Sequence, residues 1–387
     1  MMTGELAQVQ SDARKWLLGV AAPFWSRVGR TESHLYAERL SRAGEPNTDY
    51  YRTFVQARQI YAFSAAHSQG WDGAALDQVR ETQNRLVGSA RRADGFYAHK
   101  LTHEGAILDE RADLYDQAFV LFGFAASGQL LDKPSLFDEA EHLLDVLEAR
   151  WSHPEGGFTE GEIVDNSIRR QNPHMHLLEA FSALYQGSGR QRFGDAALSI
   201  AELCRTRFIE AKTGALIEYF EQDWRPLADV RGQIVEPGHC LEWAWLFEGF
   251  ASIGGAEALA VSDALTGFAR ARGIDARRGV AINEVLTNGD VHDDKARLWP
   301  QTERMKAAIS RYARTRDNHE AREIISAYRG LEKYFLPGHP ALWTDKMLND
   351  GTFLNELTPA SSFYHIACAI NELLNLDIAT AGAAPER

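Results

Sequence analysis

Three histidines near the beginnings of helix-like segments could carry out proton transfer: His176, His239 and His365. An unperturbed imidazole titrates at about pH 6.5, so it serves as an acid or a base near neutral pH. Each histidine also has a competing structural role, because an imidazole at a helix start can satisfy buried carbonyl groups. The neighbouring residues indicate which role each histidine favours.

The first histidine lies in the segment from Asn172 to Ala180, where Pro173 indicates the first turn of a helix. His174 and His176 are two residues apart, so they point in different directions on a helix and do not easily share a metal ion. The sequence favours a structural role for His174. For His176, a structural role and a position facing a cavity both stay open.

The second histidine is accompanied by a carboxylate and two indoles. His239 and Glu242 share one helix face, where the carboxylate could hold the imidazole tautomer or bind a sugar hydroxyl. Trp243 and Trp245 offer flat apolar surfaces for the C–H faces of a sugar, although core packing explains them in part. In di-iron bundles the Glu precedes the His and a second such pair is required. We therefore predict no metal site.

The third histidine follows a helix start at which Ser361 or Ser362 is a suitable cap. The aromatic and aliphatic neighbours of His365 predict that its side chain is buried or faces a cavity. Burial without a nearby charge disfavours the imidazolium form, which suits a base. A core histidine with satisfied hydrogen bonds explains the same residues equally well.

Other polar and aromatic side chains occur at further helix starts. Phe54 and Arg58 share a face at a four-residue spacing, and an Arg in a buried helix is costly unless it is paired or faces a polar cavity. Arg58 could therefore hold an oxyanion. Tyr115, Trp299 and Glu303 lie near two more helix starts. Each of these residues is a weak signal by itself.

The segments that must position these side chains are almost all helical. Glycine-containing turns, often followed by an aromatic residue, recur at intervals of about 60 residues, which predicts about six helical hairpins. One short stretch, 279–285, favours a strand or hairpin that closes at the turn 287–290. Apolar residues recur at helical spacing in segments 50–68, 114–130, 136–151, 176–187, 193–208, 241–254, 256–271, 297–316, 319–334 and 361–373.

Six helical hairpins can close into an all-α double ring, an (α/α)6 barrel with a cavity at its loop-rich mouth. Periodicity alone leaves an open solenoid as an alternative. No linker-like stretch divides the chain, so we expect a single catalytic domain over residues 1–387. The last residues, 379–387, are predicted to be a loose tail.

The composition excludes several other classes of protein. Hydrophobic residues make up 45% and charged residues 25% of the 387 residues, as in ordinary folded proteins. A net charge of −13 argues against nucleic acid as a partner. No apolar run approaches the roughly 20 residues that span a bilayer, and the N-terminus lacks a signal-peptide pattern, so we expect a cytoplasmic protein with no membrane partner. The cysteines, Cys204, Cys240 and Cys368, lack metal-like spacing and are expected to be reduced.

Taken together, the motifs resemble those of the N-acylglucosamine 2-epimerase superfamily, whose bacterial members include mannose isomerases, sulfoquinovose isomerases and cellobiose 2-epimerases. The matching stretches extend from about residue 50 to residue 370 and occur in the same order as in the superfamily. The matching stretches are Phe54–Arg58, Leu114–Phe119, Asn172–Ala180, Pro237–Trp243, Trp299–Glu303 and Ser362–His365.

The resemblance implies an (α/α)6 barrel that acts on a free monosaccharide, as a monomer or homodimer, without metal or cofactor. It carries the acid–base pair over to His239 and His365, with His176 or His239 opening the sugar ring and Arg58 stabilising an oxyanion. We find no Gly-rich phosphate loop for a nucleotide. The resemblance also suggests further substrate neighbours: Tyr115, Asn172, Glu242, Trp299 and Glu303, to which Phe54 and Trp243 are added from their own positions.

The form of the segment around His176 is similar to that of the mannose and sulfoquinovose isomerases. We therefore expect an aldose–ketose isomerase that interconverts D-mannose and D-fructose through a cis-enediol(ate). A sugar 2-epimerase would use nearly the same residues, because the outcome depends on placements of about 1 Å. A glycoside hydrolase using Glu242 and Glu303, and a non-catalytic sugar-binding protein, are the alternatives from other classes.

Overall fold

The computed structural model describes residues 2–165 and 167–378, so the predicted loose tail at 379–387 lies outside the described residues. Helices dominate the chain, and π-helical turns at 17–21, 25–29 and 204–208 extend some of them. The α-helices are α1 (Met2–Trp16), α2 (Ala22–Phe24), α3 (Thr53–Ser68), α4 (Ala75–Ala90), α5 (Leu114–Leu130), α6 (Ser135–Trp151), α7 (Gln171–Ser188), α8 (Gln191–Leu203), α9 (Pro237–Arg272), α10 (Trp299–Thr315), α11 (Asn318–Glu332) and α12 (Ser361–Asn375).

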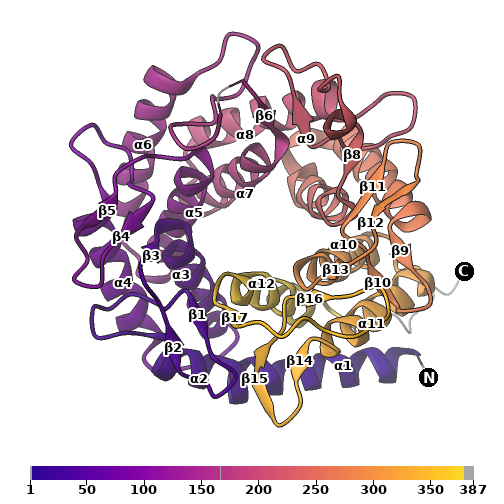
Figure 1. Cartoon of the computed structure of the whole chain (residues 1–387), viewed down its shortest axis with the longest axis horizontal. Coiled ribbons are helices and arrows are strands. Elements are labelled where there is room, and N and C mark those ends of the chain that lie inside the picture. The colour runs from indigo at the N-terminus through magenta and orange to yellow at the C-terminus, as the bar shows by residue number, and fades with distance from the viewer. Residues whose placement is uncertain (1, 166, 379–387) are drawn as a thin grey trace, which may run out of the picture.

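Two concentric layers of helices form a closed ring (Figure 1). In the inner layer α3 packs on α5, α5 on α7, α7 on α9, α9 on α10, α10 on α12, and α12 returns to α3. The outer layer contains α4, α6, α8, α11 and α1. Helix α9 serves both layers, because Gly255 (φ 65°, ψ −155°) interrupts it and separates an inner half from an outer half. The fold is therefore the predicted (α/α)6 barrel, and ring closure rules out the open solenoid.

Hydrophobic patterning explains which helices take the inner layer. Helix α5 is apolar or small around most of its circumference, and the majority of its residues are buried. Helix α4 buries one stripe that includes Val79 and Leu86 and exposes charged residues on its other face. A helix surrounded by neighbours needs the first pattern, and a helix that covers the outside needs the second.

The connections on the two ends of the barrel differ in length. Short ones follow the inner helices, whereas long ones precede them and carry all the β-structure. Strand β11 pairs with β12 around residues 287–290, which confirms the predicted hairpin. The strands are β1 (Arg39–Leu40), β2 (Pro46–Asn47), β3 (Tyr51–Arg52), β4 (Lys100–Leu101), β5 (Ile107–Asp109), β6 (Arg169–Arg170), β7 (Tyr219–Phe220), β8 (Ile234–Val235), β9 (Ile274–Asp275), β10 (Val280–Ala281), β11 (Glu284–Leu286), β12 (Val291–Asp293), β13 (Ala296–Arg297), β14 (Phe335–Leu336), β15 (His339–Trp343), β16 (Lys346–Met347) and β17 (Thr358–Pro359).

A repeated hydrogen-bond clamp ties the long connections to the inner helices. Gln56 bonds both the backbone N–H and the C=O of Tyr36, twenty residues earlier. Gln117 and Gln301 hold Tyr97 and Ala281 in the same way. In α7 the corresponding position is His174, whose Nε2 accepts from the Phe158 N–H at 3.1 Å. His174 therefore has the structural role that the sequence favours.

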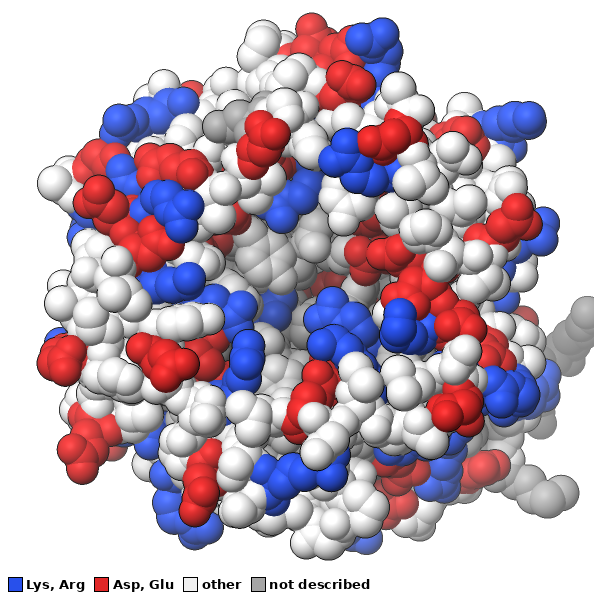
Figure 2. All heavy atoms as spheres, viewed as in Figure 1, with Lys and Arg blue, Asp and Glu red and all other residues white. Residues whose placement is uncertain are grey.

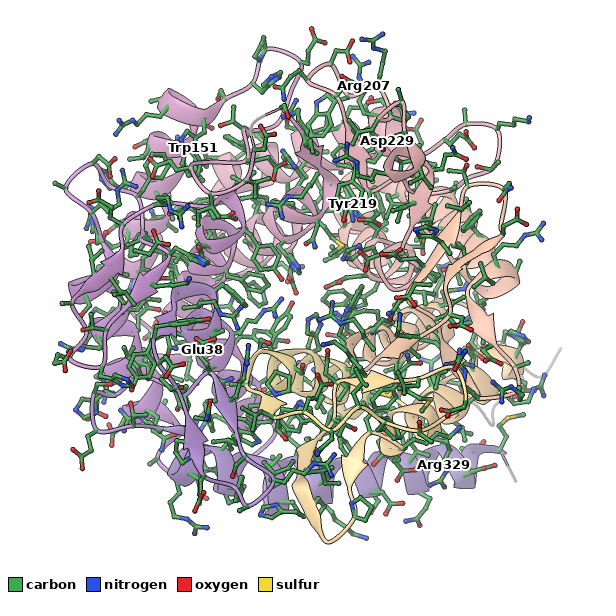
Figure 3. The ribbon with its side chains drawn as sticks, in the orientation of Figure 1. Glu38, Trp151, Arg207, Tyr219, Asp229 and Arg329 are labelled. Atoms are coloured by element: carbon green, nitrogen blue, oxygen red, sulfur yellow. The ribbon has the colours of Figure 1, made fainter. Side chains whose placement is uncertain are left out.

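Side chains fill the ring and its rim (Figure 3). Tyr219 lies at the inner side of the ring in this view, whereas Arg207 and Arg329 lie at its outer edge. The three cysteines are free and buried, as predicted. None of the helices in residues 2–165 and 167–378 combines the length and apolar character needed to cross a bilayer.

Candidate active site

The inner helices present side chains to the centre of the barrel in three layers. Positions i, i+4 and i+7 of a helix share one face, and each inner helix supplies one such triplet. The mouth layer consists of Phe54, Tyr115, Asn172, Gly238, Trp299 and Ser361. The middle layer consists of Arg58, Phe119, His176, Glu242, Glu303 and His365. The floor layer consists of Tyr61, Phe122, Glu179, Trp245, Lys306 and Cys368.

The sequence-predicted residues fall into this register with two exceptions, His239 and Trp243, each one position beyond a layer residue of α9. His239 follows Gly238 and still reaches the site, because its ring centroid lies 4.8 Å from that of Trp299. Trp243 lies one position beyond the middle-layer residue Glu242, and one residue turns a helix by about 100°. Its indole is fully buried, donates Nε1–H to Gln171 Oε1 at 2.6 Å and stacks on Phe247. Trp243 therefore packs in the core beside the inner helix and not among the middle-layer side chains.

His365 is held by a buried carboxylate. Its Nδ1 lies 2.9 Å from Glu303 Oε1, and the side chain of Glu303 is fully buried. Burial, together with the positive charges of Arg58 and Lys306, holds the pKa of His365 well below its usual range. The ring is therefore neutral at physiological pH. With Nδ1–H donated to Glu303, Nε2 keeps a free lone pair that can accept a proton.

His239 has the opposite character. Its Nδ1 lies 3.0 Å from Glu218 Oε2 and 3.8 Å from Glu236 Oε2. Burial lowers the pKa of His239, but the negative charges of Glu218 and Glu236 outweigh it and raise the pKa to about 10. His239 is therefore an imidazolium near neutral pH. Glu218, and not the expected Glu242, is the carboxylate that holds its tautomer.

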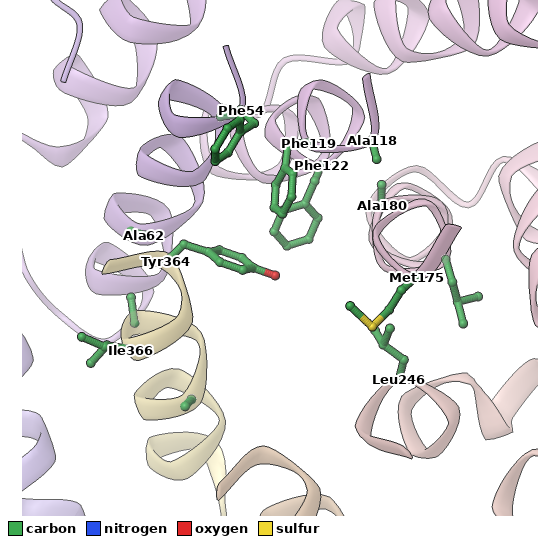
Figure 4. Close-up of a cluster of buried hydrophobic side chains, with 14 of the residues drawn as sticks. Phe54, Ala62, Ala118, Phe119, Phe122, Met175, Ala180, Leu246, Tyr364 and Ile366 are labelled. Atoms are coloured by element: carbon green, nitrogen blue, oxygen red, sulfur yellow. The ribbon is translucent and has the colours of Figure 1, made fainter. Parts of the chain in front are cut away.

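His176 is neutral and belongs to a second buried network. Its Nδ1 lies 3.1 Å from Glu179 Oε2, and the other oxygen of Glu179 accepts from the Tyr364 hydroxyl. Burial lowers the pKa of His176 to about 4 despite the charge of Glu179. Figure 4 shows Tyr364 of α12 pointing across toward Phe119 and Phe122 of α5.

Arg58 carries its charge into the same space. Its Nη2 donates to the Tyr115 hydroxyl at 2.5 Å, and its guanidinium carbon lies 4.3 Å from the Phe119 ring centroid and 5.1 Å from that of Phe54. Within the described chain, Arg58 forms no ion pair with a carboxylate. The buried Oδ1 of Asn172 likewise accepts no hydrogen bond from the described residues. Both groups are therefore available to a polar ligand.

Trp299 lies between the protonated His239 and the neutral His365. Its ring centroid is 4.8 Å from that of His239 and 5.8 Å from that of His365. Gly238 makes this position accessible, because a Cβ there would lie 2.6 Å from ring carbons of Trp299. The mouth layer thus provides a flat indole beside an acid and a base.

We expect Gly238→Ala to lower the free energy of unfolding by about 1–3 kcal/mol, the usual cost of overpacking. Urea denaturation would measure this. The matched control is Gly249→Ala in the same helix, where an added Cβ meets no atom within 4 Å, so relief of the glycine cost should raise stability by about 0.5–1 kcal/mol. Equal effects of the two variants would contradict the packing argument.

Some groups in this site could in principle hold a cation. Among the described residues, three sets place ligand atoms within 4.8 Å of one another: His176, Glu179 and Glu242; Glu218, Glu236 and His239; Glu242, Glu303 and His365. In the last set the ammonium of Lys306 already lies 2.6 Å from Glu303 Oε2. In the second set the positive charge of His239 balances the carboxylates. The chain's own cations thus occupy two of the three sets.

Sequence reasoning missed Glu218, Glu179 and Lys306. Glu179 follows His176 by three residues, the same spacing that drew attention to Glu242, so that rule could have found it. The signal for Glu218 is the internal repeat. Glu38 and Glu160 occupy the same place in other repeats, where each accepts from the backbone N–H and the Nε of an arginine.

An (α/α)6 barrel with an imidazolium, a neutral imidazole and an unpaired arginine at its centre defines a class of barrel proteins equipped for acid–base chemistry on a sugar. Residues 36–369 match the sequence profile of the N-acylglucosamine 2-epimerase (GlcNAc 2-epimerase) family. The chain belongs to this family, and it is a sugar isomerase or epimerase.

Individual relatives carry related names. The chain is 38% identical over 385 residues to a mannose-6-phosphate isomerase of Rhizobium meliloti (strain 1021), covering 96% of this chain and 97% of the relative. It is 29% identical over 210 residues to a D-mannose isomerase of Thermobifida fusca, covering 50% and 51%. A cellobiose 2-epimerase structure from Bacillus thermoamylovorans superimposes with a TM-score of 0.86 at 18% identity, covering 95% of this chain and 99% of that one, which shows a shared fold.

Proposed function

We propose that the protein is an aldose–ketose isomerase that interconverts D-mannose and D-fructose. The observation that carries this proposal is the pairing of a protonated His239 with a neutral His365 on either side of Trp299. Isomerisation needs an acid to open the pyranose ring and a base to move a proton between C2 and C1. The two histidines supply these functions at one pH because carboxylates surround His239, whereas burial and the charges of Arg58 and Lys306 act on His365.

In the proposed reaction, His239 donates a proton to the ring oxygen, the ring opens, and the O1 proton passes through water to His239, which becomes an imidazolium again. His365 Nε2 then removes the C2 proton, which gives a cis-enediol(ate) whose oxyanion is stabilised by Arg58. Return of that proton to C1, with transfer of the O2 proton to O1, gives the ketose. Glu242 has ligand atoms within 4.8 Å of His176 in one cluster and of His365 in another, and α7 lies across the inner ring from α12. His176 could deliver a proton to the opposite face of C2, which would instead give the epimer.

The charges at the mouth support an uncharged sugar as substrate. Arginines and lysines surround the central hollow (Figure 2), but acidic partners neutralise the arginines that begin the inner helices. The three pairs are Arg52 with Glu38 at 2.7 Å, Arg170 with Glu160 at 2.7 Å and Arg297 with Asp345 at 3.2 Å. A phosphate would have to compete with these carboxylates.

D-Mannose 6-phosphate is the second candidate substrate, because the relative that matches over nearly the whole chain bears the name mannose-6-phosphate isomerase. Hydrolysis has less support. Glu242 and Glu303 are both buried and already contact Lys306 or His365, so neither is arranged as a free acid or nucleophile across a glycosidic bond.

The test is to incubate the purified, EDTA-treated protein with D-mannose or D-mannose 6-phosphate in D2O and follow the C1 and C2 protons by NMR. We expect fructose from mannose, with deuterium at C1 to the extent that His365 exchanges its proton with solvent, and no loss of rate after EDTA. Faster turnover of D-mannose 6-phosphate than of D-mannose would identify the phosphate ester as the substrate. Glucose as the first product from mannose would identify the protein as an epimerase. Absence of turnover and exchange with both sugars, with glucose and with cellobiose would contradict the proposal.

A further inference from the structure

Lys306 lies at the floor of the candidate site with its side chain fully buried. Its Nζ is 2.6 Å from Glu303 Oε2 and 3.9 Å from Glu242 Oε1, and it lies 3.7 Å from the ring centroid of Trp245. Burying an ammonium is costly unless it is paired. The pairing here is with the two carboxylates directly beneath the sugar position.

The environment of Lys306 is strongly acidic. Glu303 is on its own helix, Glu242 on α9 and Glu179 on α7, while Cys368 and Glu372 approach from α12. Like charges in a buried cluster repel, so without a cation one carboxyl group would take up a proton. Among the described residues of the floor layer, Lys306 is the only one that can prevent this.

We propose that Lys306 is a positioning residue that keeps Glu303 ionised, so that Glu303 fixes the tautomer of His365 with Nε2 directed to the sugar, while the positive charge of Lys306 disfavours the imidazolium form of that ring. This inference rests on the proposed function, because it assigns His365 as the base. A protonated Glu303 could not accept the Nδ1–H of His365 in the same way, and His365 would lose its fixed tautomer.

The effect of Lys306 on ionisation has a definite sign. Its positive charge lowers the pKa of Glu303 against the larger effect of burial, and it contributes to the lowered pKa of His365. The reaction needs Glu303 ionised and His365 neutral. Removal of the ammonium raises both pKa values, so the acid limb of the pH–kcat profile must move to higher pH.

A cavity of about 610 Å³ lies on the other side of the floor, and Trp245, whose ring contacts Lys306, separates the buried ammonium from it. Tyr61, Phe122, Glu179 and Trp245 of the floor layer line it. The cavity exists because the next positions on the inner helices are small: Ala65, Ala126, Ala183 and Gly249. Removal of the Lys306 side chain would leave a space beside Trp245, next to this cavity, that a small amine could fill.

The first experiment compares the pH–kcat profiles of the wild type and Lys306→Met, which keeps the unbranched chain, shortened by one atom, and removes the charge. An opposite charge within contact distance shifts a pKa by about 1–3, so the acid limb should move upward by about one pH unit or more. The matched control is Lys295→Met, which removes an exposed ammonium paired with Asp293 and should leave the limb in place. A folded Lys306→Met protein with an unchanged limb would overturn the proposal.

The second experiment removes the side chain and restores the charge. Lys306→Ala should lose about 10²-fold in kcat, the lower range for loss of an acid–base group, and n-propylammonium should recover part of that loss. 1-Propanol, which fills space without charge, should not. Equal recovery with both compounds would show that Lys306 only fills volume. If Lys306→Ala fails to fold, Lys306→Met with Glu303→Gln removes both charges and should fold while remaining slow.

An NMR titration of the histidine rings separates this proposal from the proposed function. The His365 signal should titrate at higher pH in Lys306→Met than in the wild type, whichever sugar the protein converts. An inactive wild type with this shift would overturn the proposed reaction and retain the electrostatic role of Lys306. An active wild type, with the His365 signal titrating at the same pH in both proteins, would support the proposed reaction and overturn the role of Lys306.

Discussion

Replacement of His365 by asparagine is expected to lower kcat by about 10²–10⁴-fold, the range for loss of a general base. The physical reason is that a carboxamide cannot accept a proton from C2, although its N–H can still donate to Glu303. Exchange of the C2 proton of mannose into D2O should fall by the same factor. Retention of exchange at the wild-type rate would assign the base to another residue.

The matched control for this variant is His174→Gln. His174 is buried within the same barrel but bonds only backbone groups. Gln56, Gln117 and Gln301 occupy its place in other repeats, so glutamine should preserve the clamp. We expect wild-type kcat, and a large loss would mean that His174 contributes more than the clamp.

Replacement of Glu218 by glutamine should move the alkaline limb of the pH–kcat profile to lower pH by about 1–3 pH units. Glu218 is the largest stabilising charge on the His239 imidazolium, whose pKa is about 10. An acid must be protonated to act, so activity that depends on His239 is lost as pH rises through its pKa. Loss of the Glu218 charge lowers that pKa and brings the loss closer to neutral pH. Stopped assays between about pH 6 and pH 10 would measure it.

Glu38→Gln supplies the control for Glu218→Gln. Glu38 holds Arg52 at the equivalent place of the first repeat and has no histidine partner among the described residues; Figure 3 labels it. This variant removes a comparable buried carboxylate, so any loss of stability should be similar while the alkaline limb stays in place. A shift of the limb in both variants would mean that the effect of Glu218 is not exerted through His239.

Much of the fold follows from the sequence because its signals are local. Helical periodicity and recurring glycine turns predict the hairpins, whereas closure into a ring was implied by the family resemblance. The mouth and middle layers were also accessible, since Phe54 and Arg58 already show the four-residue spacing that recurs in Trp299 and Glu303. Extending that spacing to every inner helix would have placed Trp243 one residue out of phase, but it would have done the same to His239, whose contact with Trp299 only the structure shows.

The ionisation states were not accessible, because they depend on contacts between distant segments. Glu218 lies in the long connection before α9, 21 residues before His239 in the sequence. No local sequence pattern links the two residues. The sequence predicted a neutral, buried His365 but could not foresee that Lys306 and Glu303 would surround it. Nor could it distinguish His239 from His176 as the acid, since burial alone lowers the pKa of both.

The three-layer register has a consequence for how this chain tolerates insertions and deletions. A residue gained or lost inside an inner helix, between the mouth and floor positions, would rotate every later side chain of that helix by about 100° and remove it from its layer. A residue gained in a long connection, by contrast, leaves the phase of every helix intact. Length variation compatible with activity should therefore be confined to the connections at the mouth, which is also where a change of sugar preference would arise.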